Sequence, residues 1–540
     1  MRSLQREPGL LLALLAAGAL VAVFVILPQI VVILVPGVDG YVKFLSEATW
    51  QRPLVNSLQV TILSTTTAVT LGFVFAYAMV YTPMPWKPFF RIIGILPLLS
   101  PPFVVATVYS LLFGPRGIVS YGVFGQSPSI FGLGGIWGVQ TIAYFPFAYQ
   151  LIADVLSRSD ARLEQAARNL GAGPWSVFRT VTLPLSRPGL GAAILTTAIY
   201  VLEDFGNPAL IGGGFTVLPT QAYALIEAFG DFSGAAAVST ILLVLALLIY
   251  VTKTRLDRGR SYVTVGGRAS SMPRPPVPAA LTRACFLACL ALAGVILLVY
   301  GTLVASALTF AFPTNLTFTT EHFEYLGAHA RSLQNTLIYS TLAAAGCAAF
   351  ALVAGFLVQR GTWRGRQIFD FIVIMPAAIP GIFFGVGYLM TFNQPWLDWV
   401  DSGALITIAL LFWNIPVAYQ AVVAGLRQID RSIDEAATIL GASSLRGFRD
   451  VLVPMLGASV QVGLVTTFVR AVTTLSVVIF LFTPRSTTAT ITIFQLVNDF
   501  NWGGAAAFTV GDIAMAVGAL VLLRGVGGRR DVLAIGVTQG

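Results

Sequence analysis

The chain has 540 residues, of which 56% are hydrophobic and only 10% are charged, and its formal net charge is +9. Soluble domains carry roughly 25% charged residues, so this chain cannot hide its apolar surface in a water-soluble globule. The same composition excludes a disordered chain, a collagen-like chain and a disulfide scaffold. We therefore expect a polytopic membrane protein, and the length allows twelve helices of ~20 residues with sizeable loops.

Hydropathy over a window of about 19 residues predicts six transmembrane helices in each half of the chain. In the first half these are Leu10–Val35, Asn56–Val80, Phe89–Phe113, Ile136–Leu156, Leu190–Ile211 and Ala235–Val251. In the second half they are Cys285–Leu308, Leu333–Val358, Ile368–Met390, Ala404–Gly425, Val460–Phe482 and Ala505–Leu523. The segments must be helices because only a helix satisfies all of its backbone groups within one apolar segment, so the expected fold class is all-α.

A basic, proline-rich stretch separates the two halves. Lys253–Arg283 holds seven basic residues against the single acid Asp257. Basic residues gather in cytoplasmic loops, so we place this stretch and both chain termini in the cytoplasm. The chain then divides into a first half (1–254), a cytoplasmic linker (255–283) and a second half (284–540).

The two halves repeat one sequence pattern. LEQAARNLGAGPWSVFRTVTLPL (163–185) overlays IDEAATILGASSLRGFRDVLVPM (433–455) at an offset of 433 − 163 = 270. Upstream, ILPLLSPP (95–102) overlays IMPAAIPG (374–381) at an offset of 374 − 95 = 279. The chain is therefore a tandem fusion of two homologous halves that form a parallel repeat.

The repeated loops cover residues 157–186 and 427–457, between the fourth and fifth predicted helices of each half, on the cytoplasmic side. Each loop is expected to form two short helices. Gly171 and Gly441 suit the left-handed position that follows the end of a helix. The next short helix would begin at Pro174 or Ser443.

The second short helix of each loop is expected to have an apolar side. The residues that form this side are Val177, Phe178, Leu445 and Phe448. An exposed apolar ridge on a cytoplasmic loop predicts a docking element for a partner protein. The alternative is a loop that packs only on its own helices.

These loops resemble the EAA loop of membrane permeases in binding-protein-dependent ABC importers. Glu435, Gly441 and Pro454 carry the resemblance in the second half, whereas Gln165 stands where the family has Glu in the first half. The resemblance implies that both loops are coupling helices that insert into a separate ATPase. The implied coupling residues are Glu164, Ala166, Ala167, Gly171, Phe178, Arg179, Pro184, Glu435, Ala436, Ala437, Gly441, Phe448, Arg449 and Pro454.

The resemblance also implies the fold of a type I importer permease in a bacterial inner membrane. Its expected partners are two copies of a cytoplasmic ABC ATPase, a periplasmic or lipid-anchored solute-binding protein and the lipid bilayer, and no nucleic acid. The chain has no GxxxxGK[ST] motif, so it cannot be the ATPase itself. We expect no cofactor on this chain, because ATP and Mg²⁺ would bind the ATPase.

Within that family the chain looks most like fused iron(III)-type permeases. DFGNPALIGG (204–213) and FVRAVTTLSVVIFL (468–481) carry this similarity. It implies ferric iron as the transported solute. Relatives for 2-aminoethylphosphonate, thiamine and polyamines have close variants of these segments, so those solutes stay open.

Three charged residues fall inside predicted helices, namely Glu203, Asp204 and Arg470. A charge at the centre of a transmembrane helix costs roughly 2.5–3.5 kcal/mol, so such residues usually have a partner or a function. We expect these groups either to line the translocation pathway or to pair across the seam between the halves.

Prolines occur at matching places in the third and ninth predicted helices. They are Pro97, Pro101, Pro376 and Pro380. Each proline removes an intrahelical hydrogen bond and kinks the helix. The repeated spacing suggests a hinge or gate, and a passive kink for packing is the alternative.

The remaining metal-ligating residue types point to no metal site. His322 and His329 lie with Glu321 and Glu324 in a predicted outer loop, where solvation explains them better than a metal. Cys285, Cys289 and Cys347 lie in apolar stretches and are expected to act as small buried hydrophobes.

Two other classes of protein compete with the importer permease. A secondary transporter or channel that works alone would explain the twelve helices and the repeat, but not two matched cytoplasmic loops. A membrane-embedded enzyme would need a catalytic cluster, and the sequence has no HExxH or nucleophile motif.

Overall fold

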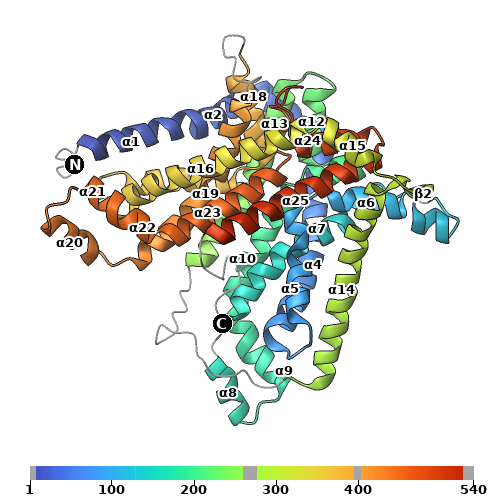
Figure 1. The fold of residues 1–540 in the computed structure, drawn as a ribbon, viewed down its shortest axis with the longest axis horizontal. Coiled ribbons are helices and arrows are strands. Elements are labelled where there is room, and N and C mark those ends of the chain that lie inside the picture. The colour runs from blue at the N-terminus through green and yellow to red at the C-terminus, as the bar shows by residue number, and fades with distance from the viewer. Residues whose placement is uncertain are drawn as a thin grey trace.

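The computed structural model describes residues 8–127, 129–157, 159, 161–258, 277–394 and 403–526. Within these residues the chain is mainly helical, with one antiparallel hairpin of β1 (Thr309–Ala311) and β2 (Asn315–Phe318). Figure 1 shows the first helices of the chain, in dark blue, running across the view beside most second-half helices, in yellow to red, whereas many of the other first-half helices, in blue to green, run down it. The all-α polytopic fold class is confirmed.

Helices make up most of both halves of the chain. The first half contains α1 (Pro8–Val21), α2 (Leu27–Leu34), α3 (Gly37–Ser46), α4 (Ala48–Tyr81), α5 (Lys87–Ile95), α6 (Val104–Phe113), α7 (Leu133–Ser157), α8 (Ala161–Asn169), α9 (Pro174–Val177), α10 (Leu183–Leu202), α11 (Gly206–Ile211), α12 (Leu218–Glu227) and α13 (Phe232–Arg258). The second half contains α14 (Ala279–Ala307), α15 (Glu321–Ala328), α16 (Arg331–Gln359), α17 (Arg366–Ile374), α18 (Gly381–Phe392), α19 (Ala404–Gln428), α20 (Ser432–Ile439), α21 (Ser444–Gly447), α22 (Val453–Met455), α23 (Gly457–Thr473), α24 (Ala489–Asn498) and α25 (Trp502–Val526).

Among the described residues, 9 helices are long and apolar enough to cross a membrane, or up to 11 if two bent pairs each count as one span. The number twelve stays a prediction. Most of the predicted linker lies outside the described residues, at 259–276, as do residues 1–7 and 527–540 at the two ends of the chain.

Two predicted helices end earlier than expected. The helix predicted over Leu190–Ile211 is interrupted, because the Asp204 carboxylate accepts hydrogen bonds from the backbone N–H (3.3 Å) and the side-chain amide (2.8 Å) of Asn207 at the start of α11. In the second half α23 ends at Thr473, so the helix predicted to reach Phe482 is also too long. Glu203 and Asp204 therefore lie at a break between helices, not inside one.

The predicted proline kinks are confirmed. Pro97 and Pro376 each lie in a short 3-10 turn, over residues 96–99 and 375–378. In the second half, the segments before and after this break (Arg366–Ala378 and Gly381–Phe392) differ in direction by 108°. Pro101 and Pro380 follow the turns outside regular helix. Whether the breaks act as hinges or gates stays a prediction.

The first helix of each half packs on the opposite half. Helices α1 and α2 lie along α16 and α18, where the Tyr388 hydroxyl donates a 2.8 Å hydrogen bond to the carbonyl of Phe24 (Figure 1). Helix α14 lies against α4 and α5 of the first half, and the hydroxyl of its Tyr300 is 2.6 Å from that of Ser100, which follows the turn at residues 96–99. Consequently the sequence halves interlock, and neither is a separate packing unit.

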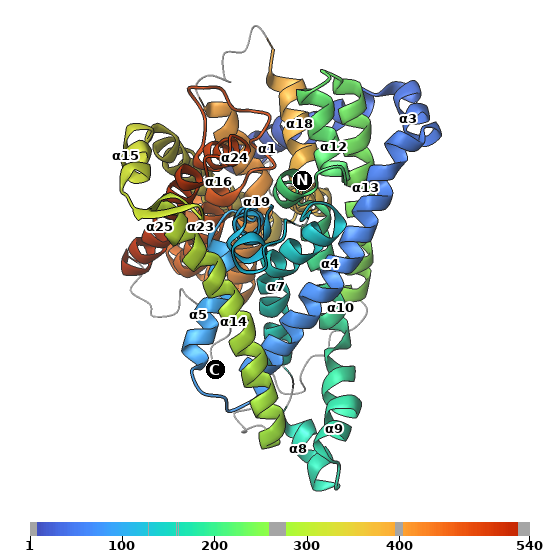
Figure 2. The ribbon, with the colours of Figure 1, turned by 90° about the vertical axis from the view of Figure 1, so that its right-hand side faces the viewer.

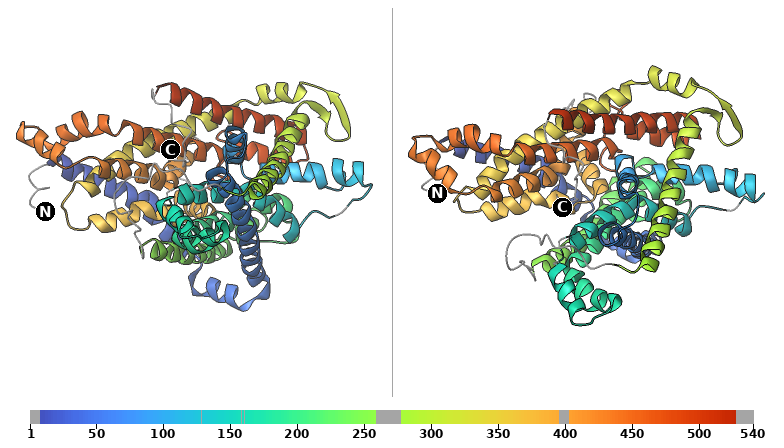
Figure 3. Two further views of the ribbon diagram at one scale, coloured as in Figure 1. Left: turned by 90° about the horizontal axis from the view of Figure 1, so that it is seen from below. Right: turned by 60° about the horizontal axis from the view of Figure 1, so that its bottom comes forward.

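The apolar cores also combine residues from both halves, because the first helix of each half packs on the opposite half. Cys285 and Cys289 of α14 belong to the apolar core of the first half, together with Phe75 and Tyr149. All three cysteines are buried and free, as expected for small hydrophobes. The left view of Figure 3 shows the molecule from below, with most second-half helices extending away from the first-half group.

Candidate functional site

Each repeated loop forms a helical elbow that protrudes from its bundle. The first elbow comprises α8 and α9 (residues 161–177), and the second comprises α20 and α21 (residues 432–447). Figure 1 places the first elbow at the lower end of its bundle and the second at the left end of the other. Figure 2 shows that α8 and α9 lie at the opposite end of the molecule from α12.

Both elbows bend at a glycine in the same backbone conformation. Gly171 has φ 88° and Gly441 has φ 83°. In the first elbow the N–H of Ala172 donates to the carbonyl of Ala167 (3.0 Å), and the N–H of Gly171 donates to that of Arg168 (2.9 Å). The corresponding bonds in the second elbow, Ala442 to Ala437 and Gly441 to Thr438, are both 3.0 Å. This pair of bonds is a Schellman motif, so the predicted left-handed glycines are confirmed.

The short second helices begin as predicted. Pro174 is the first residue of α9. Ser443 precedes α21, and its side chain accepts a hydrogen bond from the backbone N–H of Arg446 (3.4 Å). Nearby, the N–H of Ser432 donates to the carboxylate of Asp430 (2.9 Å), which lowers the pKa of Asp430 and keeps a charged acceptor at the start of α20.

The exposed apolar residues of the elbows differ from most of those predicted. Val177 is buried, Phe178 packs against Tyr77 with ring centroids 5.8 Å apart, and Phe448 packs against Phe356 at 4.6 Å. Of the predicted set only Leu445 is strongly exposed. The prediction is wrong for the other three because α4 and α16 lie on that side.

The apolar surface that the elbows present is formed by their bends instead. Leu170 is 89% exposed beside Gly171, and Leu440 is 87% exposed beside Gly441. The other large exposed apolar side chains are Leu163, Trp175, Ile439 and Leu445. An apolar side chain at almost full exposure gains free energy when a partner covers it.

The acidic residues of the two elbows have different surroundings. Glu164 is buried and accepts hydrogen bonds from the hydroxyls of Tyr81 (2.8 Å) and Thr182 (2.9 Å). Glu435 is exposed. At the offset of the repeat, the residue that corresponds to Glu164 is Asp434 (434 − 164 = 270), which directly precedes Glu435. Asp434 was missed by the sequence analysis, although the offset of the repeat was sufficient to find it.

The other predicted coupling residues lie on the surface or near it. Ala166, Arg179, Ala436, Arg449 and Pro454 are exposed, whereas Ala167, Pro184 and Ala437 are half-buried. The exposed residues are accessible to a partner, whereas the half-buried ones are partly covered by the chain itself.

A cavity of about 420 Å³ lies between the two halves. The structure brings all three charged candidates to it, because Glu203, Asp204 and Arg470 all line this cavity. Tyr200 from the first half and Trp413 from the second also line it. Wall residues such as Leu98 and Leu99 come from the turn that contains Pro97, so the break in the third predicted helix borders the same cavity.

Asp204 and Arg470 are held by their own halves. Asp204 accepts hydrogen bonds from Gln140 (2.9 Å) and from Asn207, so its carboxylate stabilises the fold. The Nε of Arg470 donates to the amide oxygen of Asn414 (3.0 Å), and the guanidinium lies 5.1 Å from the centre of the Trp413 ring.

Glu203 has a different environment at the same cavity. Its Oε1 atom is buried and has no hydrogen-bond partner among the described residues. No ion pair joins it to Arg470 in the part of the chain that the structure describes. In this conformation Glu203 and Arg470 therefore do not form the ion pair between the two halves that was the alternative to a pathway.

The histidines of the outer loop contact backbone carbonyls. The Nε2 of His322 lies 3.0 Å from the carbonyl of Thr309, and the Nδ1 of His329 lies 2.9 Å from that of Tyr325. Within the described ranges, no group of three or more His, Cys, Asp or Glu residues could hold a metal ion.

Comparison with known proteins identifies the family. Residues 68–262 and 347–526 match the family described as binding-protein-dependent transport system inner membrane component. The ferric transport system permease protein FbpB of Actinobacillus pleuropneumoniae is 29% identical over 97% of this chain and 79% of its own length. The Fe(3+)-transport system permease protein FbpB 2 of Haemophilus influenzae is 23% identical over 88% of this chain and 90% of its own.

A shorter relative matches one part of the chain. The molybdenum transport system permease protein ModB of Escherichia coli is 33% identical over 40% of this chain and 98% of its own length. The two family matches cover both predicted halves and, together with the apolar helices, indicate a multi-pass inner-membrane protein that is a transport component and not an enzyme. The chain thus belongs to the binding-protein-dependent transport system inner membrane components, as the permease component of an ABC transporter.

Proposed function

We propose that this chain is the membrane subunit of an ATP-driven importer that receives ferric iron from a solute-binding protein. Both elbows then face the cytoplasm, as do the chain termini and the linker. A cytoplasmic ABC ATPase docks on each elbow, so two copies bind each permease. ATP and Mg²⁺ bind those subunits, and this chain carries no cofactor.

The observation that carries this proposal is the repeated elbow. Two loops 270 residues apart have the same Schellman motif and expose a leucine beside the same bend. Exposed leucines at matching positions of two loops are typical of a surface that a partner protein covers, and a loop without a partner gives no reason for them. A stand-alone secondary transporter gives no reason for this duplication.

The cavity between the halves supports a pathway between them. Glu203 and Arg470 come from opposite halves and line one cavity without pairing to each other in the described structure. Since charged groups in a membrane domain usually line a pathway or find a partner, we assign both to the translocation pathway. Relative movement of the halves would change the shape of this cavity, and the breaks after Pro97 and Pro376 would act as hinges.

The choice of solute rests on the relatives. Two relatives that match most of this chain are named as ferric permeases, whereas the relative named as a molybdenum permease matches only 40% of it. We therefore place ferric iron first. Molybdate is the second candidate, because a guanidinium at the cavity would attract an oxyanion.

The test is transport by the complete complex. The chain is purified with the ATPase and the binding protein of the same organism and reconstituted in proteoliposomes, and uptake of radioactive ferric iron is measured with and without ATP. We expect uptake to require both partners. Molybdate, 2-aminoethylphosphonate, thiamine and spermidine are added in turn as competitors, and none of them is expected to reduce iron uptake.

Two results would contradict the proposal. Equal uptake with and without the ATPase would identify a stand-alone transporter. ATP-dependent uptake of a competitor in place of iron would keep the importer and change its solute.

A further inference from the structure

One side chain holds the first elbow at two points. Tyr81 is the last residue of α4, and its hydroxyl lies 2.9 Å from the hydroxyl of Ser159 and 2.8 Å from Oε1 of Glu164. Ser159 belongs to the connection between α7 and α8, and Glu164 lies in the first turn of α8. Consequently the end of α4 is tied both to the entry of the elbow and to its first helix. We call these contacts the first clamp.

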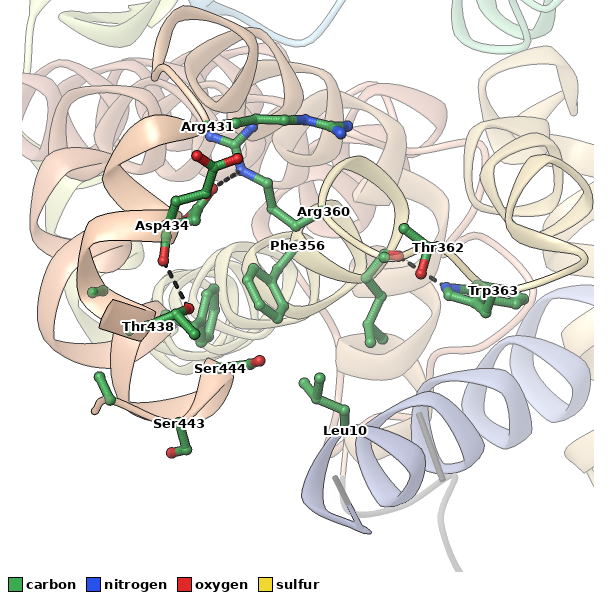
Figure 4. Close-up of a pocket in the computed structure, with 17 residues that line it drawn as sticks. Leu10, Phe356, Arg360, Thr362, Trp363, Arg431, Asp434, Thr438, Ser443 and Ser444 are labelled. Carbon is green, nitrogen blue, oxygen red and sulfur yellow. Dashed lines mark hydrogen bonds and ion pairs between the residues drawn. The ribbon is translucent and has the colours of Figure 1, made fainter. Parts of the chain in front are cut away.

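The second elbow is held at the same two points by a different chemical group. Arg360 directly follows α16, and its Nε lies 2.8 Å from Oδ2 of Asp434. One of its terminal nitrogens donates to the carbonyl of Ile429 (2.8 Å). Figure 4 shows the dashed contact between Arg360 and Asp434 beside Thr438. We call these contacts the second clamp.

The repeat shows that the two clamps are equivalent. Ile429 and Asp434 lie 270 residues after Ser159 and Glu164 (429 − 159 = 270, 434 − 164 = 270). Arg360 corresponds to Tyr81 at an offset of 360 − 81 = 279, the same offset that relates residues 95–102 to residues 374–381. The chain therefore keeps the geometry in both halves while the first clamp uses a neutral phenol and the second uses an ion pair.

The surroundings of the two clamps also differ. Glu164 is 2% exposed and has a second donor in Thr182. The side chains of Arg360 and Asp434 are 11% and 32% exposed. They line a pocket of about 270 Å³ that also touches Leu10 of α1 (Figure 4). Dissolved ions therefore reach the second clamp more easily than the first.

We propose that the two clamps transmit the movement of the elbows to α4 and α16, and that only the second clamp weakens as ionic strength rises. Screening shortens the reach of charge–charge attraction from about 10 Å at 0.1 M salt to about 3 Å at 1 M. A hydrogen bond between a phenol and a buried carboxylate is not screened in this way. The transmission part rests on the proposed docking of ATPases, whereas the difference in salt response does not.

Hydrogen exchange on the full-length chain in lipid nanodiscs tests the salt response. Exchange is measured at 0.05 M and 1 M KCl for peptides that cover residues 163–172 and 433–442. Partly exposed ion pairs change an equilibrium by about two- to fivefold, so we expect this increase in the second elbow only. An equal salt response in both elbows, or none in the second, would overturn the proposal.

Three variants assign the effect to the clamps, and a fourth serves as their control. Arg360→Gln should speed hydrogen exchange in the second elbow at both salt concentrations and remove its salt response. Asp434→Asn should have the same effect, because it removes the acidic member of the same ion pair. Arg364→Gln removes the same charge from an exposed residue nearby and should behave like the wild type. Tyr81→Phe should speed exchange in the first elbow equally at both concentrations.

Transmission is tested in the complete transporter by the ratio of iron imported to ATP hydrolysed. Arg360→Gln should retain the bound ATPases and lower this ratio severalfold, whereas a ratio equal to that of the wild type would refute transmission through the second clamp. If the wild-type complex shows no ATP-dependent uptake, the proposed function fails, and the exchange experiment still decides whether the clamps differ.

Discussion

Replacing Gly441 by alanine should open the second elbow by a predictable amount. Gly441 has φ 83°, and a Cβ atom built there meets no other atom within 4 Å. Steric clash with neighbouring groups therefore contributes nothing, and the cost comes from the backbone alone. An L-residue in the left-handed region costs roughly 1–2 kcal/mol, which corresponds to about a 5- to 30-fold shift of the elbow toward opened conformations.

The assay is hydrogen exchange of residues 433–442 in the purified full-length chain. We expect Gly441→Ala to speed exchange within that range, and Gly441→Asn to have a smaller effect because asparagine tolerates the left-handed region. Gly171→Ala should act in the same way on the first elbow, since Gly171 has φ 88° and the same open surroundings.

Gly447→Ala is the matched control. Gly447 lies within α21, and a Cβ atom there would make an ordinary 3.7 Å contact with Ala437. Alanine favours helix over glycine, so this change should not speed exchange. If Gly441→Ala and Gly447→Ala exchange equally, the elbow does not depend on the left-handed glycine and the reasoning is refuted.

Four further changes test the site. Leu440→Asp should reduce the amount of ATPase that copurifies with the chain, because Leu440 is 87% exposed and a charge there opposes apolar docking; unchanged copurification would remove Leu440 from the interface. Arg470→Ala should abolish uptake while ATPase binding persists, and Asn414→Ala should cause a smaller loss because Arg470 would lose its 3.0 Å hydrogen bond; loss of the folded complex would favour a structural function. Asp204→Asn should destabilise the fold by about 1–3 kcal/mol, as measured by thermal unfolding in detergent, because the amide cannot accept all the hydrogen bonds that the buried carboxylate accepts.

The elbows could be predicted because their geometry is encoded locally. A glycine at the end of a short helix, followed by proline or serine two or three residues later, is sufficient for a left-handed bend and a new helix start. The structure shows both at Gly171 and Gly441. The proline breaks are also local, because a proline lacks the N–H that the preceding turn requires.

The side of each elbow that is buried could not be predicted in this way. Val177, Phe178 and Phe448 are apolar and fit a docking ridge by sequence, yet they pack inward. Glu164 has the sequence of an exposed helix residue, yet it is buried under Tyr81 and Thr182. These contacts join residues far apart in sequence, so local pattern carries no information on them.

By itself, the sequence determined that the chain lies in a membrane, that it is duplicated and that each half carries a bent loop, since hydropathy, repetition and helix ends are properties of neighbouring residues. Tertiary structure alone decided that α1 and α14 exchange between halves, that Glu203 and Arg470 line one cavity without pairing in the described conformation, and that Tyr81 and Arg360 hold the elbows. In a membrane every helix is apolar on most of its surface, so hydrophobic pattern does not select its neighbour, and only the packing of shapes and the few polar contacts do.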